Sequence, residues 1–188
     1  MRIGIFGGSF NPVHNMHKNI SLELIKNGYL DMVIYVPTGD NYNKKDLIEF
    51  RHRLNMLKLM VDGNDKLDVS DIGNSNSHQY TYQVLDYFKD VYNNDDIYFI
   101  CGSDNLKLFD TWKEYQYILK HYKLLVIKRN EDNLDEILSK YDKYKDKIII
   151  TNIMENQISS TSIRNDIDNA SQYLDKKVYA YIKNNRLY

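Results

Sequence analysis

The sequence predicts an α/β fold of the Rossmann-like kind, a three-layer sandwich in which helices cover both faces of a central parallel sheet. Short apolar runs alternate with longer amphipathic stretches along the chain, which is the pattern of strands joined by helices. Helical crossovers return the chain to the same end of the sheet, so the strands are expected to be parallel. Glycine-containing loops follow the first and the fourth apolar run, and ligands in such sheets bind beyond the carboxyl ends of strands.

The individual elements follow from these runs. The expected strands are Arg2–Phe6, Met32–Pro37, Leu67–Asp71, Ile97–Cys101, Lys123–Ile127 and Lys147–Thr151. The expected helices are Met16–Asn27, Leu47–Val61, Thr81–Tyr92, Trp112–His121, Leu134–Tyr144, Ser162–Ile167 and Lys176–Asn184. The sequence contains no repeat and no linker long enough to divide it, so residues 1–188 are expected to form one domain. Two polar loops, Asp40–Asp46 and Asn74–His78, are candidates for movement when a ligand binds.

Composition limits the classes of function. Hydrophobic residues form 43% and charged residues 27% of the chain, which are ordinary values for a globular protein. The net charge of −1 gives no broad basic surface for nucleic acid or for an anionic membrane, and no apolar run approaches the length of a membrane span. The single cysteine, Cys101, excludes an internal disulfide and lies in an apolar run, so it is interpreted as a core residue. No signal peptide precedes the first strand, and the expected location is the cytoplasm.

The most informative stretch is GIFGGSFNPVHNMH, residues 4–17. Gly7 and Gly8 lack a Cβ atom, so the backbone there can turn sharply and approach a ligand closely. Pro12 stiffens the loop, and Asn15 is the expected N-cap of the helix that follows. The stretch therefore predicts a ligand-binding loop that leads directly into a helix.

Two imidazoles lie at the N-terminus of this helix, with His14 just before it and His17 in its first turn. Unpaired N–H groups and the positive end of the helix dipole attract phosphate at such a position. Both rings could donate hydrogen bonds to one anion and stabilise charge that develops in a transition state. A zinc site is the alternative for two histidines, but the sequence offers no convincing third or fourth ligand nearby. The glycines match neither the GxGxxG dinucleotide fingerprint nor a P-loop.

Four segments resemble one known family. GGSFNPVHNMH is similar to the signature of the nucleotidyltransferase superfamily, G-x-F-D/N-P-x-H-x-G-H, and ISSTSIRNDI, residues 158–167, is similar to its second phosphate motif. FICGSDNLKLFDTWKEYQYIL, residues 99–119, and the ending VYAYIKNNRLY resemble bacterial nicotinate-nucleotide adenylyltransferases. The resemblance implies the nucleotidyltransferase type of Rossmann-like fold. It also implies transfer of the adenylyl group of ATP to nicotinate mononucleotide, which gives deamido-NAD and pyrophosphate in NAD biosynthesis.

The resemblance assigns residues to an ATP site. The implied catalytic residues are His14, His17, Lys44 and Arg164. The implied ATP-binding residues are Gly7, Gly8, Ser9, Phe10, Gly102, Asp104, Ser160 and Thr161. The grouping of Ser160, Thr161 and Arg164 is physically sensible, because backbone N–H groups, hydroxyls and a guanidinium can converge on one anion. Taken alone, its segment SSTSIR equally fits an ordinary capped surface helix.

For the mononucleotide, the resemblance implies Tyr80, Thr81, Trp112 and Arg129. Trp112 is the only tryptophan and would stack on the pyridine ring, although a core anchor is the plain alternative. Thr81 also fits the N-cap of the helix that follows it. Arg129 would lie near the phosphate of the substrate.

Several departures from the family pattern concern substrate choice. Relatives usually carry Pro-Pro-His-Lys after the second strand, where this chain has GDNYNKK, residues 39–45. Lys44 keeps the register of the family lysine that meets phosphate, although Lys44 and Lys45 equally fit solvated surface charges. Met16 replaces the usual glycine between the histidines, and Asn11 replaces an aspartate, which keeps hydrogen bonding and removes a charge.

The expected partners are ATP and nicotinate mononucleotide, without nucleic acid or membrane, and homo-oligomerisation is left open. Mg²⁺ is expected to accompany ATP, bound mainly through phosphate oxygens and water, without a dedicated metal site in the protein. The nearest alternative function is that of a sibling enzyme with nicotinamide mononucleotide, phosphopantetheine or another phosphorylated acceptor. A non-catalytic nucleotide-binding module on the same fold is the alternative from another class.

Overall fold

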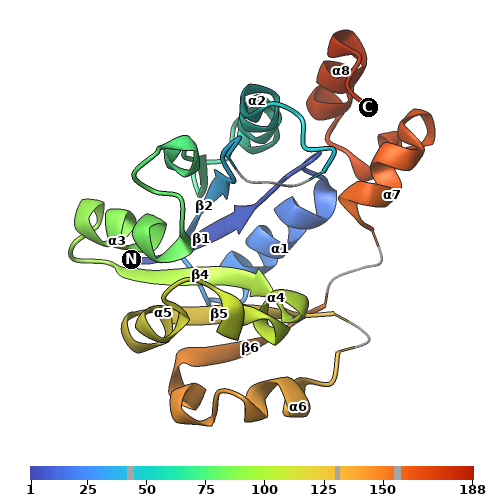
Figure 1. Cartoon of the computed structure of the whole chain (residues 1–188). Coiled ribbons are helices and arrows are strands. Elements are labelled where there is room, and N and C mark those ends of the chain that lie inside the picture. Colours follow the sequence, from blue (N-terminus) through green and yellow to red (C-terminus); the bar gives the residue numbers. More distant parts are fainter. Residues whose placement is uncertain (42–44, 130–131, 155–157) are drawn as a thin grey trace.

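The computed structural model describes residues 1–41, 45–129, 132–154 and 158–188. Within these ranges, six parallel strands form one sheet in the order β3-β2-β1-β4-β5-β6, with helices on both faces, which confirms the predicted fold class (Figure 1). The strands are β1 (Arg2–Gly8), β2 (Met32–Pro37), β3 (Leu67–Val69), β4 (Asp96–Gly102), β5 (Lys123–Lys128) and β6 (Ile148–Met154). The helices are α1 (Asn15–Lys26), α2 (Phe50–Val61), α3 (Thr81–Val91), α4 (Ser103–Lys107), α5 (Tyr115–His121), α6 (Leu134–Ser139), α7 (Ser160–Asn165) and α8 (Lys176–Asn185). No helix in these ranges has the length and apolar character that a bilayer crossing needs.

Several predicted boundaries are wrong for identifiable backbone reasons. α5 begins at Tyr115 rather than at Trp112, because Glu114 adopts a left-handed conformation with φ of 56°. The predicted helix Leu134–Tyr144 ends at Ser139, and a 3₁₀ segment with a kink at Tyr144 follows it.

Other differences lie at the two ends of the sheet. β3 ends at Val69, because the chain turns there into a 3₁₀ helix, Ile72–Asn74. β6 lies one to three residues later than predicted, at Ile148–Met154. The short helix α4 was not predicted, since it begins directly after β4 and has only 5 residues.

The core consists of two apolar layers, one on each face of the sheet. Alternate residues of each strand point to opposite faces, so that Val33 and Tyr35 of β2 belong to one layer and Ile34 and Val36 to the other. The first layer also contains residues of α1, α2, α7 and α8, and the second contains residues of α3, α4, α5 and α6. Figure 1 shows α8 beside α2, with α7 below α8, on the opposite side of the molecule from α6.

The strand order reverses between β1 and β4, which are paired neighbours. Ile3 pairs with Ile97 and Ile5 with Phe99, so the two strands run in register toward the same edge of the sheet. Both strands end in glycine, at Gly8 and Gly102, because β1 and β4 extend into the segments that were expected to be loops. Their carboxyl ends open onto one crevice, at the position expected for a ligand.

A buried tyrosine supports the start of α1 from the sheet. Tyr35 is fully buried; its hydroxyl donates to the carbonyl of His17 at 3.1 Å and lies 2.6 Å from Oγ of Ser21. Burial raises the pKa of Tyr35, so this hydroxyl remains protonated and available as a donor. The position of the first turn of α1 thus depends on a side chain of β2.

Replacing Tyr35 with phenylalanine is expected to lower the free energy of unfolding by about 1–2 kcal/mol, because Ser21 loses a buried partner. The hydroxyl of Tyr29 provides the control, since it makes one exposed contact to Asn152 at 3.4 Å. Tyr29→Phe is expected to change stability by no more than about 0.5 kcal/mol. Urea denaturation of both variants checks this, and equal losses would contradict the role given to Tyr35.

Candidate active site

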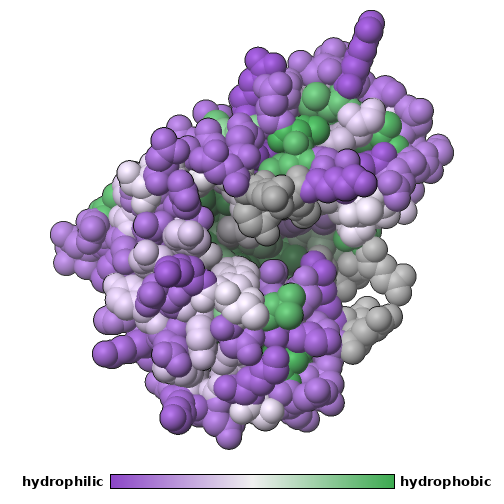
Figure 2. Space-filling view, in the orientation of Figure 1, coloured by the Kyte–Doolittle hydropathy of each residue, from purple (hydrophilic) through white to green (hydrophobic). Residues whose placement is uncertain are grey.

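A cleft of about 950 Å³ lies at the carboxyl ends of β1, β2, β4 and β5, a size within the range of cofactor sites. Figure 2 shows this face of the molecule hollowed at its centre, with hydrophobic residues at the floor. The cleft brings together most of the residues proposed from the sequence. Those that line it are Gly7, Gly8, Ser9, Phe10, His17, Tyr80, Thr81, Gly102, Asp104, Trp112, Arg129, Ser160 and Thr161.

The two histidines are stacked at the start of α1. His14, rather than the predicted Asn15, occupies the N-cap position, since its backbone is extended with φ of −140°. The ring centroids of His14 and His17 are 3.8 Å apart. The backbone N–H of His14 donates to Nδ1 of His17 at 3.2 Å, so the proton of a neutral His17 ring is on Nε2. His17 lines the cleft, whereas His14 is 3% exposed and lies behind it.

Burial sets the charge of both rings. It lowers the pKa of His14 to about 4, and the positive charge of Arg129 acts in the same direction. The pKa of His17 also lies well below its ordinary value, through burial and the neighbouring His14. Both imidazoles are therefore neutral near pH 7, and His17 meets the cleft as an uncharged donor.

The segment that resembles the second phosphate motif, residues 158–167, is hydrogen-bonded to the loop after β1. Ser160 donates its hydroxyl to the carbonyl of Pro12 at 2.9 Å. Arg164 donates from Nη1 to the carbonyl of Asn11 at 2.7 Å and from Nη2 to the hydroxyl of Thr161 at 3.4 Å. These bonds bring α7 to the histidine loop across about 150 residues of sequence. Arg164 itself does not line the cleft in this conformation.

The motif after β4 places an ion pair in the cleft. Oδ2 of Asp104 lies 3.0 Å from Nη1 of Arg129, and Ser103 accepts a hydrogen bond from the backbone N–H of Arg129 at 2.9 Å and donates one to Asp132. A Cβ atom at Gly102 would lie 2.4 Å from Oδ1 of Asp104, so only glycine leaves room for this carboxylate. Oδ1 is itself buried and has no hydrogen-bond partner among the described residues.

The side predicted for the mononucleotide is aromatic. Trp112 is half-buried and packs on Phe109 and Phe99, with centroid distances of 5.0 and 5.8 Å, while it also borders the cleft. It is thus a partial core anchor with a surface left for a ligand. Tyr80 is 47% exposed at the cleft and occupies the N-cap position of α3, which corrects the alternative role of Thr81 as that cap.

Both polar loops reach the cleft, and they are joined to each other. The backbone N–H of Asp40 donates to Oδ1 of Asn74 at 3.0 Å. A Cβ atom at Gly73 would lie 2.4 Å from the carbonyl oxygen of Pro37, so the two segments pack backbone against backbone. Lys44, the catalytic residue proposed within the first loop, lies outside the described residues.

Sequence reasoning missed a buried arginine that holds several of these segments. Arg53 is fully buried in α2, and its guanidinium donates to the carbonyls of Thr38 at 2.6 Å, Ile48 at 2.9 Å and Ser9 at 3.2 Å. Its Nη2 lies 3.3 Å from the carboxylate of Asp40. Its spacing could have indicated that it is buried, because Arg53 occupies the same helical face as the buried residues Phe50, Met56, Leu57 and Met60.

No cluster of three or more His, Cys, Asp or Glu that could hold a metal ion occurs in the part of the chain that the structure describes. Cys101 is buried, and burial raises the pKa of its thiol to about 12. It therefore belongs to the core as predicted, and the cleft contains donors for a polyanion rather than an activated thiol.

The lowered pKa of His14 predicts acid sensitivity. The unfolded chain binds a proton near pH 6.5 and the folded chain only near pH 4, so stability is lost as pH falls through this window. Replacing His14 with asparagine removes the titration. Between pH 7 and pH 4.5, we expect the wild type to lose about 2 kcal/mol more unfolding free energy than His14→Asn. Urea melts at the two pH values measure the difference, and parallel losses would show that His14 is not buried in its neutral form.

Comparisons with known proteins agree with this geometry. The family model described as cytidylyltransferase-like matches residues 5–166. The probable nicotinate-nucleotide adenylyltransferase of Acholeplasma laidlawii is 33% identical over 98% of this chain and 96% of its own length. Plasmodium falciparum nicotinic acid mononucleotide adenylyltransferase complexed with NaAD is similar in structure, with a TM-score of 0.81, 25% identity and coverage of 99% and 96% of the two chains. The structure of the same enzyme complexed with APC gives a TM-score of 0.77, at the same identity and coverage.

The fold, the cleft and these similarities over nearly the full length lead to one assignment. This chain belongs to the cytidylyltransferase-like family and, within it, to the nicotinate-nucleotide adenylyltransferases.

Proposed function

We propose that this chain, acting as one domain over residues 1–188, transfers the adenylyl group of ATP to nicotinate mononucleotide and releases deamido-NAD and pyrophosphate. The observation that carries the proposal is the meeting of His17, Ser160, Thr161 and Trp112 in one cleft. The ring of His17 and the hydroxyl of Thr161 offer donors to a polyphosphate, Ser160 joins α7 to the histidine loop through Pro12, and the indole offers a flat surface to an aromatic base. The names of the relatives support the choice of acceptor.

The proposed reaction needs one displacement at phosphorus. An oxygen of the mononucleotide phosphate attacks the α-phosphorus of ATP, and the bond from that phosphorus to the oxygen bridging it to the β-phosphorus breaks, so that pyrophosphate leaves. A phosphate monoester loses its second proton near pH 6, so the nucleophile is already ionised and needs no general base. Catalysis then rests on positioning and on stabilisation of charge.

Each group in the cleft has a defined part in this displacement. The neutral ring of His17 donates from Nε2 to a phosphate oxygen, since its Nδ1 already accepts from the backbone. Ser160 and Thr161, in the first turn of α7, line the same cleft, where the hydroxyl of Thr161 can donate to a phosphate oxygen. Positive charge comes from Arg164, whose guanidinium is held beside Thr161 by the carbonyl of Asn11, and from Lys44. Arg129 meets the mononucleotide phosphate in place of Asp104.

Mg²⁺ enters this proposal with the triphosphate. We expect phosphate oxygens and water to hold the ion. When bound, it would neutralise part of the triphosphate charge. The proposed partners are the two small-molecule substrates, and the proposed location is the cytoplasm.

The purified protein with ATP and Mg²⁺ is expected to release pyrophosphate when nicotinate mononucleotide is added, and more slowly with nicotinamide mononucleotide. Coupled pyrophosphate detection measures the rates, and mass spectrometry identifies deamido-NAD. Turnover with phosphopantetheine instead would assign the chain to a sibling activity. Binding of ATP without turnover would indicate a non-catalytic module.

Replacing His17 with alanine is expected to lower kcat by roughly 10²-fold or more, because a preorganised donor to the transition state is lost. His121→Ala is the control, since His121 stacks on Tyr117 at 4.3 Å and does not line the cleft. The rates are measured by steady-state kinetics, after thermal melts have shown that the two variants are equally stable. A His17→Ala rate within a few-fold of the wild type would remove His17 from the mechanism.

A further inference from the structure

Three distant segments meet at Asn11, which is 2% exposed. The hydroxyl of Tyr188 donates to its Oδ1 at 2.7 Å. Its Nδ2 donates to the carbonyl of Asp46 at 2.8 Å, and its own carbonyl accepts from Nη1 of Arg164 at 2.7 Å. One residue of the loop after β1 therefore contacts the segment before α2, helix α7 and the chain beyond α8.

The chemistry of these partners fixes the orientation of the Asn11 amide. The carbonyl of Asp46 can only accept, so it requires the NH₂ end of the amide. The remaining Oδ1 can only accept, so it requires a donor. Two donors reach it, the hydroxyl of Tyr188 at 2.7 Å and the backbone N–H of Ile48 at 3.4 Å, so Tyr188 makes the shorter bond. Tyr188 is the third residue after α8, and its ring packs against the apolar layer that contains α1, α2 and α8. Burial raises the pKa of the Tyr188 hydroxyl, although Arg164 and Arg53 act in the opposite direction, so the proton is retained.

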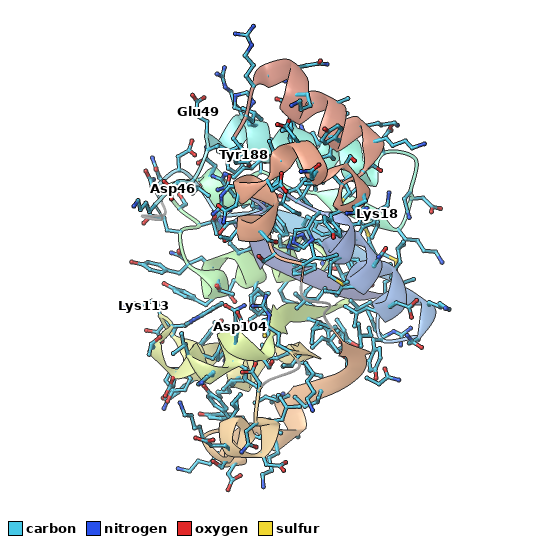
Figure 3. All side chains as sticks on the ribbon, turned by 90° about the vertical axis from the view of Figure 1, so that its right-hand side faces the viewer. Lys18, Asp46, Glu49, Asp104, Lys113 and Tyr188 are labelled. Atoms are coloured by element: carbon cyan, nitrogen blue, oxygen red, sulfur yellow. The ribbon has the colours of Figure 1, made fainter. Side chains whose placement is uncertain are left out.

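We propose that Tyr188 is a positioning residue of the ATP site and acts through Asn11. This inference rests on the proposed function, because the site that it positions is the one assigned to ATP. With the hydroxyl in place, the amide of Asn11 holds the carbonyl of Asp46, while the backbone of Asn11 holds the guanidinium of Arg164 beside Thr161, which lines the cleft. Figure 3 shows Tyr188 and Asp46 on the same side of the molecule, above Asp104.

The structure also offers a matched comparison within the same helix region. Tyr181 of α8 is bonded through its hydroxyl to Nδ1 of His52 at 3.0 Å and to Nδ2 of Asn55 at 3.1 Å. These contacts fasten α8 to α2, and the hydroxyl has no bond to Asn11. Loss of the Tyr181 hydroxyl therefore reports on the attachment of α8 alone.

The test compares Tyr188→Phe with Tyr181→Phe and with the wild type in the full chain. We expect Tyr188→Phe to lower kcat/KM for ATP by roughly 3- to 10-fold, as for loss of one neutral hydrogen bond, with KM for nicotinate mononucleotide within two-fold. Tyr181→Phe is expected to leave both constants within two-fold of the wild type, although the two variants lose similar amounts of thermal stability. ATP kinetics for Tyr188→Phe that match those of Tyr181→Phe or of the wild type would overturn the proposal.

A double-mutant cycle tests the route through Asn11. In an Asn11→Ala background, Tyr188→Phe is expected to cause no further loss in kcat/KM for ATP, whereas an independent second loss would overturn the route. Should Asn11→Ala fail to fold, the two tyrosine variants decide. A wild type without turnover on any mononucleotide would instead refute the proposed function. Calorimetric ATP affinities of the same variants would then decide the role of Tyr188, with the same 3- to 10-fold weakening expected.

Discussion

The pairing of β1 with β4 is the constraint on which the site depends. These strands are far apart in sequence, yet they lie side by side where the strand order reverses. A crossover cannot cover the crevice at such a point, so the loops after both strands stay open to a ligand. The glycines at the end of β1, Gly102 at the end of β4 and the first turn of α1 consequently line one cleft, and α7 contacts them through Pro12 and Asn11.

A second constraint acts within the loops themselves. Burying a guanidinium costs several kcal/mol unless its donors are satisfied. Arg53 meets this cost with carbonyls of three segments, at Ser9, Thr38 and Ile48, and with the carboxylate of Asp40. Because one rigid fork contacts all of them, the loop after β1 and the segment after β2 are fixed relative to α2. A hydrophobic residue of similar size would fill the space without fixing that geometry.

Apolar periodicity predicted the layers and the strands, because it records burial directly. The glycines and His17 followed from the chemistry of one local motif, whereas the other cleft residues were implied by the family resemblance. The periodicity did not predict element boundaries that depend on a single backbone angle, such as the start of α5 after Glu114. It could not predict that His14 would cap α1 and lie behind His17, since that depends on the hydrogen bond to His17 Nδ1. The burial of Arg53 was not predicted, because the hydrogen-bond partners of a charged residue on an apolar helix face are apparent only in the folded structure.

The charges in the cleft are balanced by groups of the protein itself. Both histidines are neutral through burial, and Arg129 is paired with Asp104. That ion pair is about half exposed, with 47% and 44% of the two side chains accessible, so solvent limits its worth to roughly 1 kcal/mol or less. A phosphate offers charge-assisted hydrogen bonds about twice as strong as neutral ones. Under the proposed function, a phosphate that replaces the carboxylate at Arg129 therefore gives up only this small contribution.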